Sequence, residues 1–156
     1  MSDDRPLPPA AAAVSLDGSF DPVGFFGLLA NYGHGGELGI AYLAHGEDWV
    51  EVEMPWRPEL VGVSDTGLLA SGAVVSLIDL AAGVSIWIKR GMFRPMATLD
   101  LRIDYMRPAL KGETVIVRCR CLKITRSIAF VEGIAHVGDI EDPIARSALT
   151  FMTTRS

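Results

Sequence analysis

The most constraining feature of this 156-residue chain is one long apolar segment near its middle. Residues 67–88 form a run of 22 residues with a single charged side chain, Asp79, which is long enough to span a bilayer. A carboxylate at the centre of a membrane span costs about 2.5–3.5 kcal/mol. A helix that is apolar on all sides can equally be enclosed by the rest of a soluble domain. We therefore expect a buried helix over residues 71–89 and no membrane span.

Length and composition predict one globular domain with no nucleic-acid partner. The net charge is −5 and no run of Lys or Arg occurs, whereas nucleic-acid binders concentrate positive charge. The two cysteines, Cys119 and Cys121, lack the paired spacing of a zinc site, so we expect no metal and no cofactor. Residues 1–18 are rich in Pro and Ala and are expected to be a loose leader, followed by one domain over 19–156. The acidic first residues are unlike a signal peptide, which favours a cytoplasmic protein.

Alternating polar and apolar residues predict strands on both sides of the long helix. Upstream, Asp21 and Pro22 are typical of a helix start, and strands are expected over 37–43 and 49–54. Four more strands are expected downstream. In the first of them, one face should carry Leu99, Leu101, Ile103 and Tyr105, and the other Thr98, Asp100, Arg102 and Asp104. The pattern is that of an α+β domain with one mainly antiparallel sheet curved around one helix.

Three stretches of the sequence carry a resemblance to a known family. They are Gly67-Leu68-Leu69-Ala70-Ser71-Gly72 with the following residues to Asp79, Thr98 to Ala109 ending in Tyr-Met-Arg-Pro-Ala, and Lys111-Gly112-Glu113 with Thr125 to Ala129. In this order and spacing the chain resembles the hotdog-fold thioesterases of the PaaI-like kind. The resemblance implies a hotdog fold, hydrolysis of an acyl-CoA thioester, and a homodimer with two interface sites, often paired into a tetramer.

The chain departs from the family pattern at the turn before the long helix. Ala70-Ser71-Gly72 stands where the family has His-Gly-Gly, and Ser64 stands where it often has Asn, while the helix acid is retained as Asp79. A His-Gly-Gly triplet does occur at 34–36. It precedes the first expected strand and no long apolar helix follows it, so we interpret it as a glycine-rich turn.

The chemistry of thioester hydrolysis points to two parts of the long helix. Backbone N–H groups of Ser71 and Gly72 can polarise a carbonyl at the positive end of the helix; the alternative is an ordinary serine N-cap. Asp79 can act as general base or nucleophile, or it can be a structural acid that caps a loop or pairs with an arginine such as Arg102. Eight residues of helix separate Ser71 from Asp79 by about 12 Å, too far for one small reacting group. Two antiparallel copies of the helix in a dimer would bring Ser71 of one chain beside Asp79 of the other.

The resemblance assigns roles to further residues. Thr98 falls where some relatives hold the attacking water, although threonine is also common in strands for its β-propensity. The expected substrate-binding residues are Ser64, Arg107, Arg126 and Ser127, three of which fall where such enzymes touch coenzyme A. Arginine suits phosphate, but a solvated loop arginine is the alternative. Because the motif histidine is missing, a non-catalytic domain that binds acyl-CoA or another apolar ligand is the second function we consider.

Overall fold

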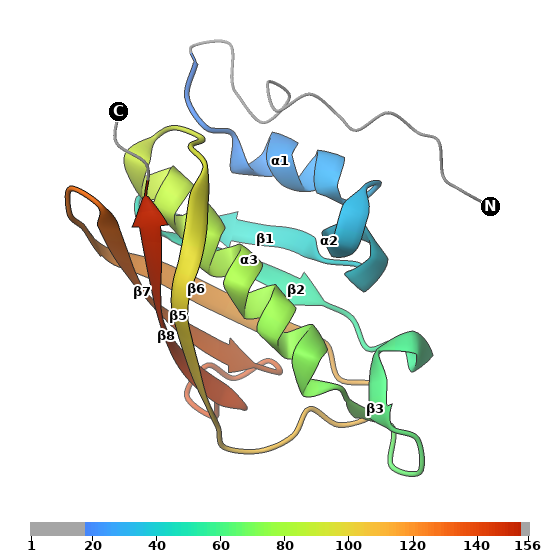
Figure 1. The fold of residues 1–156 in the computed structure, drawn as a ribbon. Coiled ribbons are helices and arrows are strands. Elements are labelled where there is room, and N and C mark those ends of the chain that lie inside the picture. Colours follow the sequence, from blue (N-terminus) through green and yellow to red (C-terminus); the bar gives the residue numbers. More distant parts are fainter. Residues whose placement is uncertain (1–17, 154–156) are drawn as a thin grey trace.

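The computed structural model describes residues 18–153, and its centre is one long helix held in a curved sheet (Figure 1). The sheet is antiparallel, with strand order β1-β2-β6-β7-β8-β5. Its strands are β1 (Ala41–His45), β2 (Trp49–Met54), β5 (Met96–Tyr105), β6 (Val115–Ile124), β7 (Ile128–His136) and β8 (Ala145–Thr153). The expected α+β hotdog architecture is confirmed, whereas the expected leader over residues 1–18 lies almost entirely outside the described residues.

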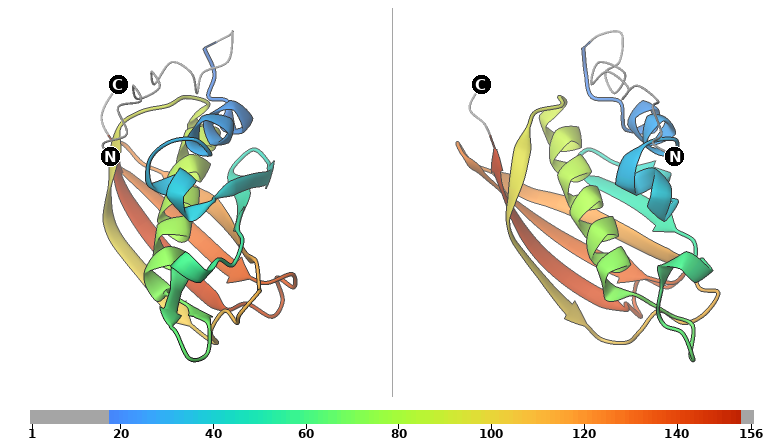
Figure 2. Two further views of the ribbon diagram at one scale, coloured as in Figure 1. Left: turned by 90° about the vertical axis from the view of Figure 1, so that its right-hand side faces the viewer. Right: turned by 45° about the vertical axis from the view of Figure 1, so that its right-hand side comes forward.

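The expected helix over 71–89 is α3 (Ser71–Arg90), and the sheet wraps around it (Figure 2). Gly91 ends the helix in the left-handed conformation at φ 69°, which glycine adopts without strain. The helix is long and apolar enough to cross a membrane, but 56% of its most apolar window is buried inside the domain. Leu77, Ile78 and Val84 are fully buried. The length of the apolar run therefore reflects packing of the helix against β2, β6 and β7 of the curved sheet.

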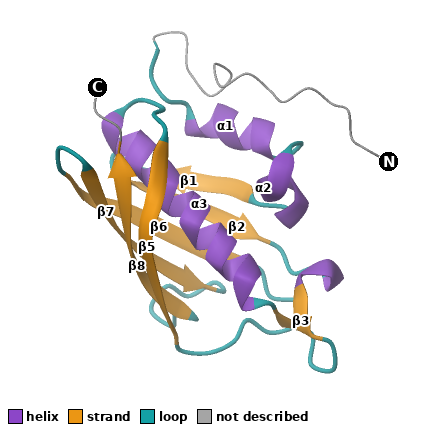
Figure 3. Ribbon diagram, in the orientation of Figure 1, coloured by secondary structure: helices purple, strands orange, loops and turns teal. Residues whose placement is uncertain are grey.

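Upstream of the sheet, two short helices cover one end of it (Figure 3). The expected helix after Asp21 is α1 (Pro22–Leu29). The strand expected over 37–43 is partly wrong, because α2 (Gly33–Leu38) takes its first residues and β1 begins only at Ala41. The reason is close packing: a side chain at Gly36 would lie 2.8 Å from the carbonyl oxygen of Leu29. A side chain at Gly35 would also overlap that of Leu29, so these two glycines let a helical turn form against the end of α1.

A small hairpin leads from β2 into α3. It contains the 3₁₀ turn Pro58–Leu60, β3 (Val61–Val63) and β4 (Leu68–Leu69), none of which the sequence pattern predicted. The backbone N–H of Ala70 donates to the carbonyl of Leu60 at 2.8 Å. This bond fixes the chain direction at the point where α3 begins.

The prediction of which β5 side chains share a face is wrong for the first residues of the strand, because a β-bulge lies between Thr98 and Asp100. Thr98 pairs with Phe151 and Leu101 pairs with Leu149, so Thr98 and Leu101 share the helix-facing side of the sheet. A bulge adds one residue to a strand and reverses the alternation beyond it. Leu99 is that residue and is 54% exposed.

Candidate active site

The contact that defines the candidate site joins α3 to β5. The Thr98 hydroxyl donates a hydrogen bond to Asp79 Oδ1 at 2.8 Å, across 19 residues of sequence. The β-bulge makes this contact possible, since regular alternation would turn Thr98 away from the helix. Asp79 itself is only partly buried. A carboxylate in an otherwise apolar helix is thus held by one hydroxyl while part of it stays accessible.

Arg102 is not the partner of Asp79. Its guanidinium contacts Asp104 at 3.2 Å on the opposite face of β5. The interpretation of Asp79 as a structural acid paired with Arg102 is therefore wrong. Asp79 also affects a thiol beneath the helix: burial, and then the charge of Asp79, raise the pKa of Cys119 far above its ordinary value. This thiol stays protonated and takes no part in nucleophilic chemistry.

Around Asp79, α3 presents a stripe of small residues. Gly72, Ser76 and Gly83 lie within one or two turns on the same side of the helix. A side chain at Gly72 would meet nothing within 4 Å, and one at Gly83 would meet only the flexible end of Met96. The stripe leaves room for another molecule next to the carboxylate.

The first turn of α3 lies at the other end of this stripe. The N-cap residue is Ala70, in the extended conformation, and Ser71 is the first helical residue. The interpretation of Ser71 as an ordinary serine N-cap is therefore wrong. In an α-helix the first N–H groups have no partner inside the helix, so Ser71 and Gly72 present donors whatever their side chains are. Both residues are exposed.

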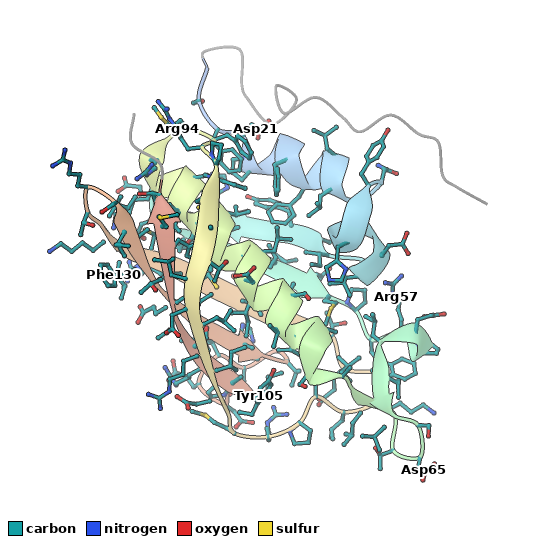
Figure 4. The ribbon with its side chains drawn as sticks, viewed as in Figure 1. Asp21, Arg57, Asp65, Arg94, Tyr105 and Phe130 are labelled. Atoms are coloured by element: carbon teal, nitrogen blue, oxygen red, sulfur yellow. The ribbon has the colours of Figure 1, made fainter. Side chains whose placement is uncertain are left out.

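A pocket of about 320 Å³ opens beside this helix start. Tyr105 borders it and donates a hydrogen bond from its hydroxyl to the Ser71 carbonyl at 3.2 Å (Figure 4). Partial burial raises the pKa of Tyr105. The remaining lining is mostly apolar and comes from Leu69, Val74, Met106, Pro108, Ala109 and Ile144, with Ser71 and Arg107. The pocket can hold an apolar group adjacent to the N–H donors.

The residues expected to bind substrate are spread over the two ends of α3. Arg107 borders the pocket and is paired with Asp142 at 3.3 Å and Glu113 at 3.9 Å. Arg126 and Ser127 are exposed in the turn between β6 and β7. This turn lies near the C-terminal end of α3, where Lys89 donates hydrogen bonds to the carbonyls of Cys121 and Leu122 on β6. Ser64 lies in the β3–β4 turn next to Asp65, which Figure 4 shows projecting from the tip of the hairpin. The structure therefore does not gather these four residues around Asp79 within one chain.

Sequence reasoning missed one residue at the site. His34 of α2 lies against α3, with its Nε2 3.1 Å from Ser76 Oγ. It belongs to the triplet interpreted as a glycine-rich turn, which in the structure is helical. No periodicity could have placed it, because the contact joins residues 42 positions apart.

Comparisons with known proteins agree with the fold. A family model described as the thioesterase superfamily matches residues 66–144, the span from the turn between β3 and β4 to the residue before β8. A solved structure of a Pseudomonas aeruginosa protein is 32% identical, covers 75% of this chain and 87% of its own, and has a TM-score of 0.68. No curated protein matches.

Two more distant structures share the fold. Zebra fish thioesterase superfamily member 2 is 23% identical with a TM-score of 0.76, and covers 86% of this chain and 96% of its own. A thioesterase from Haemophilus influenzae is 22% identical with a TM-score of 0.71, over 81% of this chain and 86% of its own.

Proposed function

Because this chain belongs to the thioesterase superfamily, whose chemistry is thioester hydrolysis, we propose that its substrate is an acyl-CoA thioester, cleaved by water with the help of Asp79. The observation that carries the proposal is the bond from Thr98 to Asp79 beside an open stripe of α3. It orients one carboxylate oxygen and leaves the other for a water molecule or for the substrate carbonyl carbon.

In the reaction, Asp79 acts as general base or nucleophile and the N–H groups of Ser71 and Gly72 bind the developing oxyanion. Such donors at a helix start need no particular side chain, so they survive the replacement of the motif histidine by Ala70. Thr98 has the additional role of holding the attacking water next to Asp79. The side chains of Thr98 and Asp79 are both at least partly accessible in the structure, as catalysis requires.

We propose that each site is shared between two copies of the chain. Ser71 and Asp79 are eight residues apart on one straight helix, about 12 Å along its axis, whereas both must lie about 3 Å from the reacting group. An antiparallel α3 of a second copy brings the missing donors to Asp79. In support, β5 is the last strand of the sheet and exposes Leu99 and Tyr105. An exposed apolar edge strand favours pairing with another chain, giving a homodimer or a dimer of dimers.

Coenzyme A would extend from the thioester toward the substrate-binding residues. Arg126 and Ser127 are exposed and can meet its phosphates. Arg107 is held by two carboxylates and would have to share its guanidinium with them. Ser64 is the fourth residue that we propose to contact the substrate. The apolar pocket beside Ser71 accepts a group next to the thioester, and a cytoplasmic location fits such a substrate.

A second function deserves a test because of one observation: Ala70, at the N-cap, offers no side-chain hydrogen bond at the helix start. If the motif histidine is indispensable, the domain would bind acyl-CoA or another apolar ligand without hydrolysing it. Binding without turnover distinguishes this function from catalysis.

The decisive experiment measures thiol release from a panel of acyl-CoAs by the wild type and by Asp79→Asn. The substitution keeps the shape and removes the carboxylate, so kcat should fall at least about 100-fold with KM little changed. Asp100→Asn is the matched control, since Asp100 lies on the opposite face of β5, paired with Thr150. Wild-type affinity without any thiol release would refute hydrolysis in favour of binding. Loss of thermal stability with unchanged turnover per folded molecule would assign Asp79 a structural role.

A further inference from the structure

His34 and Ser76 form a hydrogen-bonded pair on the flank of the candidate site opposite Thr98. His34 Nε2 lies 3.1 Å from Ser76 Oγ, and the Ser76 hydroxyl donates to the Gly72 carbonyl at 3.0 Å. A serine hydroxyl has one proton to donate. Because that proton points to Gly72, Nε2 of His34 is the donor in the pair.

The fold holds His34 in this place by several contacts. Gly36 lets α2 pack against the backbone of Leu29 at a distance that no side chain would allow. At the other end of α2, the Arg57 guanidinium donates to the Glu37 carbonyl. The N–H of Ile40 donates to the Gly35 carbonyl at 3.0 Å. These contacts fix the position of α2, and so the imidazole of His34 lies against α3.

Ser76 and Asp79 are three residues apart on α3. At this spacing two side chains lie on the same helix face with their Cβ atoms about 5–6 Å apart. Thr98 contacts Asp79 from β5, and His34 contacts Ser76 from α2. A thioester whose carbonyl carbon lies at Asp79 can therefore place its sulfur beside the Ser76 hydroxyl.

Thioester hydrolysis needs a proton at that sulfur. When the tetrahedral intermediate collapses, the C–S bond breaks and its electron pair goes to sulfur; an alkyl thiolate is basic and leaves more readily when it is protonated. Histidine is the side chain best suited to supply protons near neutral pH. The Asp79 carboxylate takes its proton from water at the attack step, so a separate donor for the sulfur is useful.

We propose that Ser76 is a catalytic residue that protonates the leaving sulfur, and that His34 is the positioning residue that holds and reprotonates it. This rests on the proposed function. The Ser76 hydroxyl turns from the Gly72 carbonyl to the sulfur and gives up its proton there. The Nε2 proton of the His34 imidazolium moves to Ser76 Oγ, and the neutral imidazole regains a proton from solvent. The proton that Asp79 took from water returns to solvent and balances the one that His34 takes up. The carboxylic acid product then ionises, so each turnover yields one carboxylate, one thiol and one proton.

The test compares two thioesters of one acyl group: its coenzyme A ester and its thiophenol ester, whose thiolate leaves without protonation. Ser76→Ala and His34→Gln should lower kcat on the coenzyme A ester at least about 10-fold. On the thiophenol ester the loss should stay within about threefold, the scatter expected of small repacking. Ser76→Thr keeps a hydroxyl and should retain activity on both esters.

The matched control is His45→Gln, because His45 is also exposed and hydrogen-bonded to a hydroxyl, that of Tyr42 at 2.8 Å on β1. It should change neither rate. Equal losses on both esters, or no loss on the coenzyme A ester, would overturn the relay while leaving hydrolysis intact. An acyl group found on Ser76 by mass spectrometry would also overturn it, since Ser76 would then be a nucleophile. A wild type inert toward both esters would overturn the proposed function and the relay together.

Discussion

Gly133 on β7 offers a sensitive test of how tightly the sheet packs under α3. A methyl group there would overlap the hydroxyl of Ser147 on β8, and would lie 2.9 Å from the sulfur of Cys119 on β6. It would be 3.8 Å from Ile78, the α3 residue that precedes Asp79. Overpacking of this kind costs about 1–3 kcal/mol. Replacing glycine by alanine in a strand otherwise raises the free energy of unfolding by about 0.5–1 kcal/mol, because alanine loses less conformational freedom on folding.

We therefore expect Gly133→Ala to lower the free energy of unfolding by about 1–2 kcal/mol. For a domain of this size that corresponds to a fall in Tm of roughly 2–8 °C. A second substitution, at Ser147, should relieve the overlap created by Gly133→Ala. Its hydroxyl is buried and has no hydrogen-bond partner within residues 18–153, so Ser147→Ala alone should be neutral or slightly stabilising.

The double variant Gly133→Ala/Ser147→Ala should recover at least half of the lost stability, because the alanine at 147 removes the closest overlapping atom. Thermal and urea unfolding of the four proteins give the coupling energy. Gly27→Ala in α1 is the control: a methyl group there meets nothing within 4 Å, and stability should stay equal or rise by up to about 1 kcal/mol. Undiminished stability in Gly133→Ala, or purely additive effects in the double variant, would refute this account of the packing.

Three further outcomes are expected. Burial raises the pKa of Cys119 far above its usual range and that of Cys121 to about 11, so at about pH 8 both thiols stay protonated. Thiol titration should therefore detect them only after unfolding, and labelling of the native protein would contradict this. Thr98→Val removes the hydroxyl that orients Asp79 and should lower kcat about 10-fold, whereas Thr98→Ser should retain most activity; equal rates in both variants would argue against an orienting role. Light scattering should give twice or four times the chain mass of 16.8 kDa, and a monomer that hydrolyses thioesters would contradict the shared site.

The parts of the fold that the sequence predicted are those governed by repeating patterns. The long apolar run predicted α3 closely, and alternation predicted the bounds of β2. These elements bury whole faces, so their periodicity is strong. Asp79 stood out because a lone carboxylate in such a run is costly unless it has a use or a partner.

What the sequence did not predict depends on single local events. The bulge beside Thr98 reverses the facing of β5 without any Gly or Pro to mark it. The helical turn at His34 depends on how closely Gly36 approaches Leu29, a contact that exists only in the folded chain. Both events decide which side chains reach α3, so the partners of Asp79 and Ser76 could be identified only from the structure.

The shared site can be tested by mixing two inactive variants. Ser71→Pro removes one oxyanion N–H. Proline is favoured at the first helical position, and Ala70 already has the extended backbone that a following proline requires, at φ −63° and ψ 132°. Loss of one such donor costs about 100- to 1000-fold in kcat, and Asp79→Asn should be similarly inactive. Each variant should fold as the wild type does.

The most direct measurement is the rate of acyl-CoA hydrolysis after the two variants are unfolded together and refolded as a mixture. In a mixed dimer, Asp79 of one chain meets the intact Ser71 turn of the other, so one of its two sites is complete. Random pairing makes half of the dimers mixed, and the mixture should regain about a quarter of wild-type activity. Activity that stays at the level of the separate variants, while light scattering shows dimers, would contradict a site built from Ser71 of one chain and Asp79 of its partner.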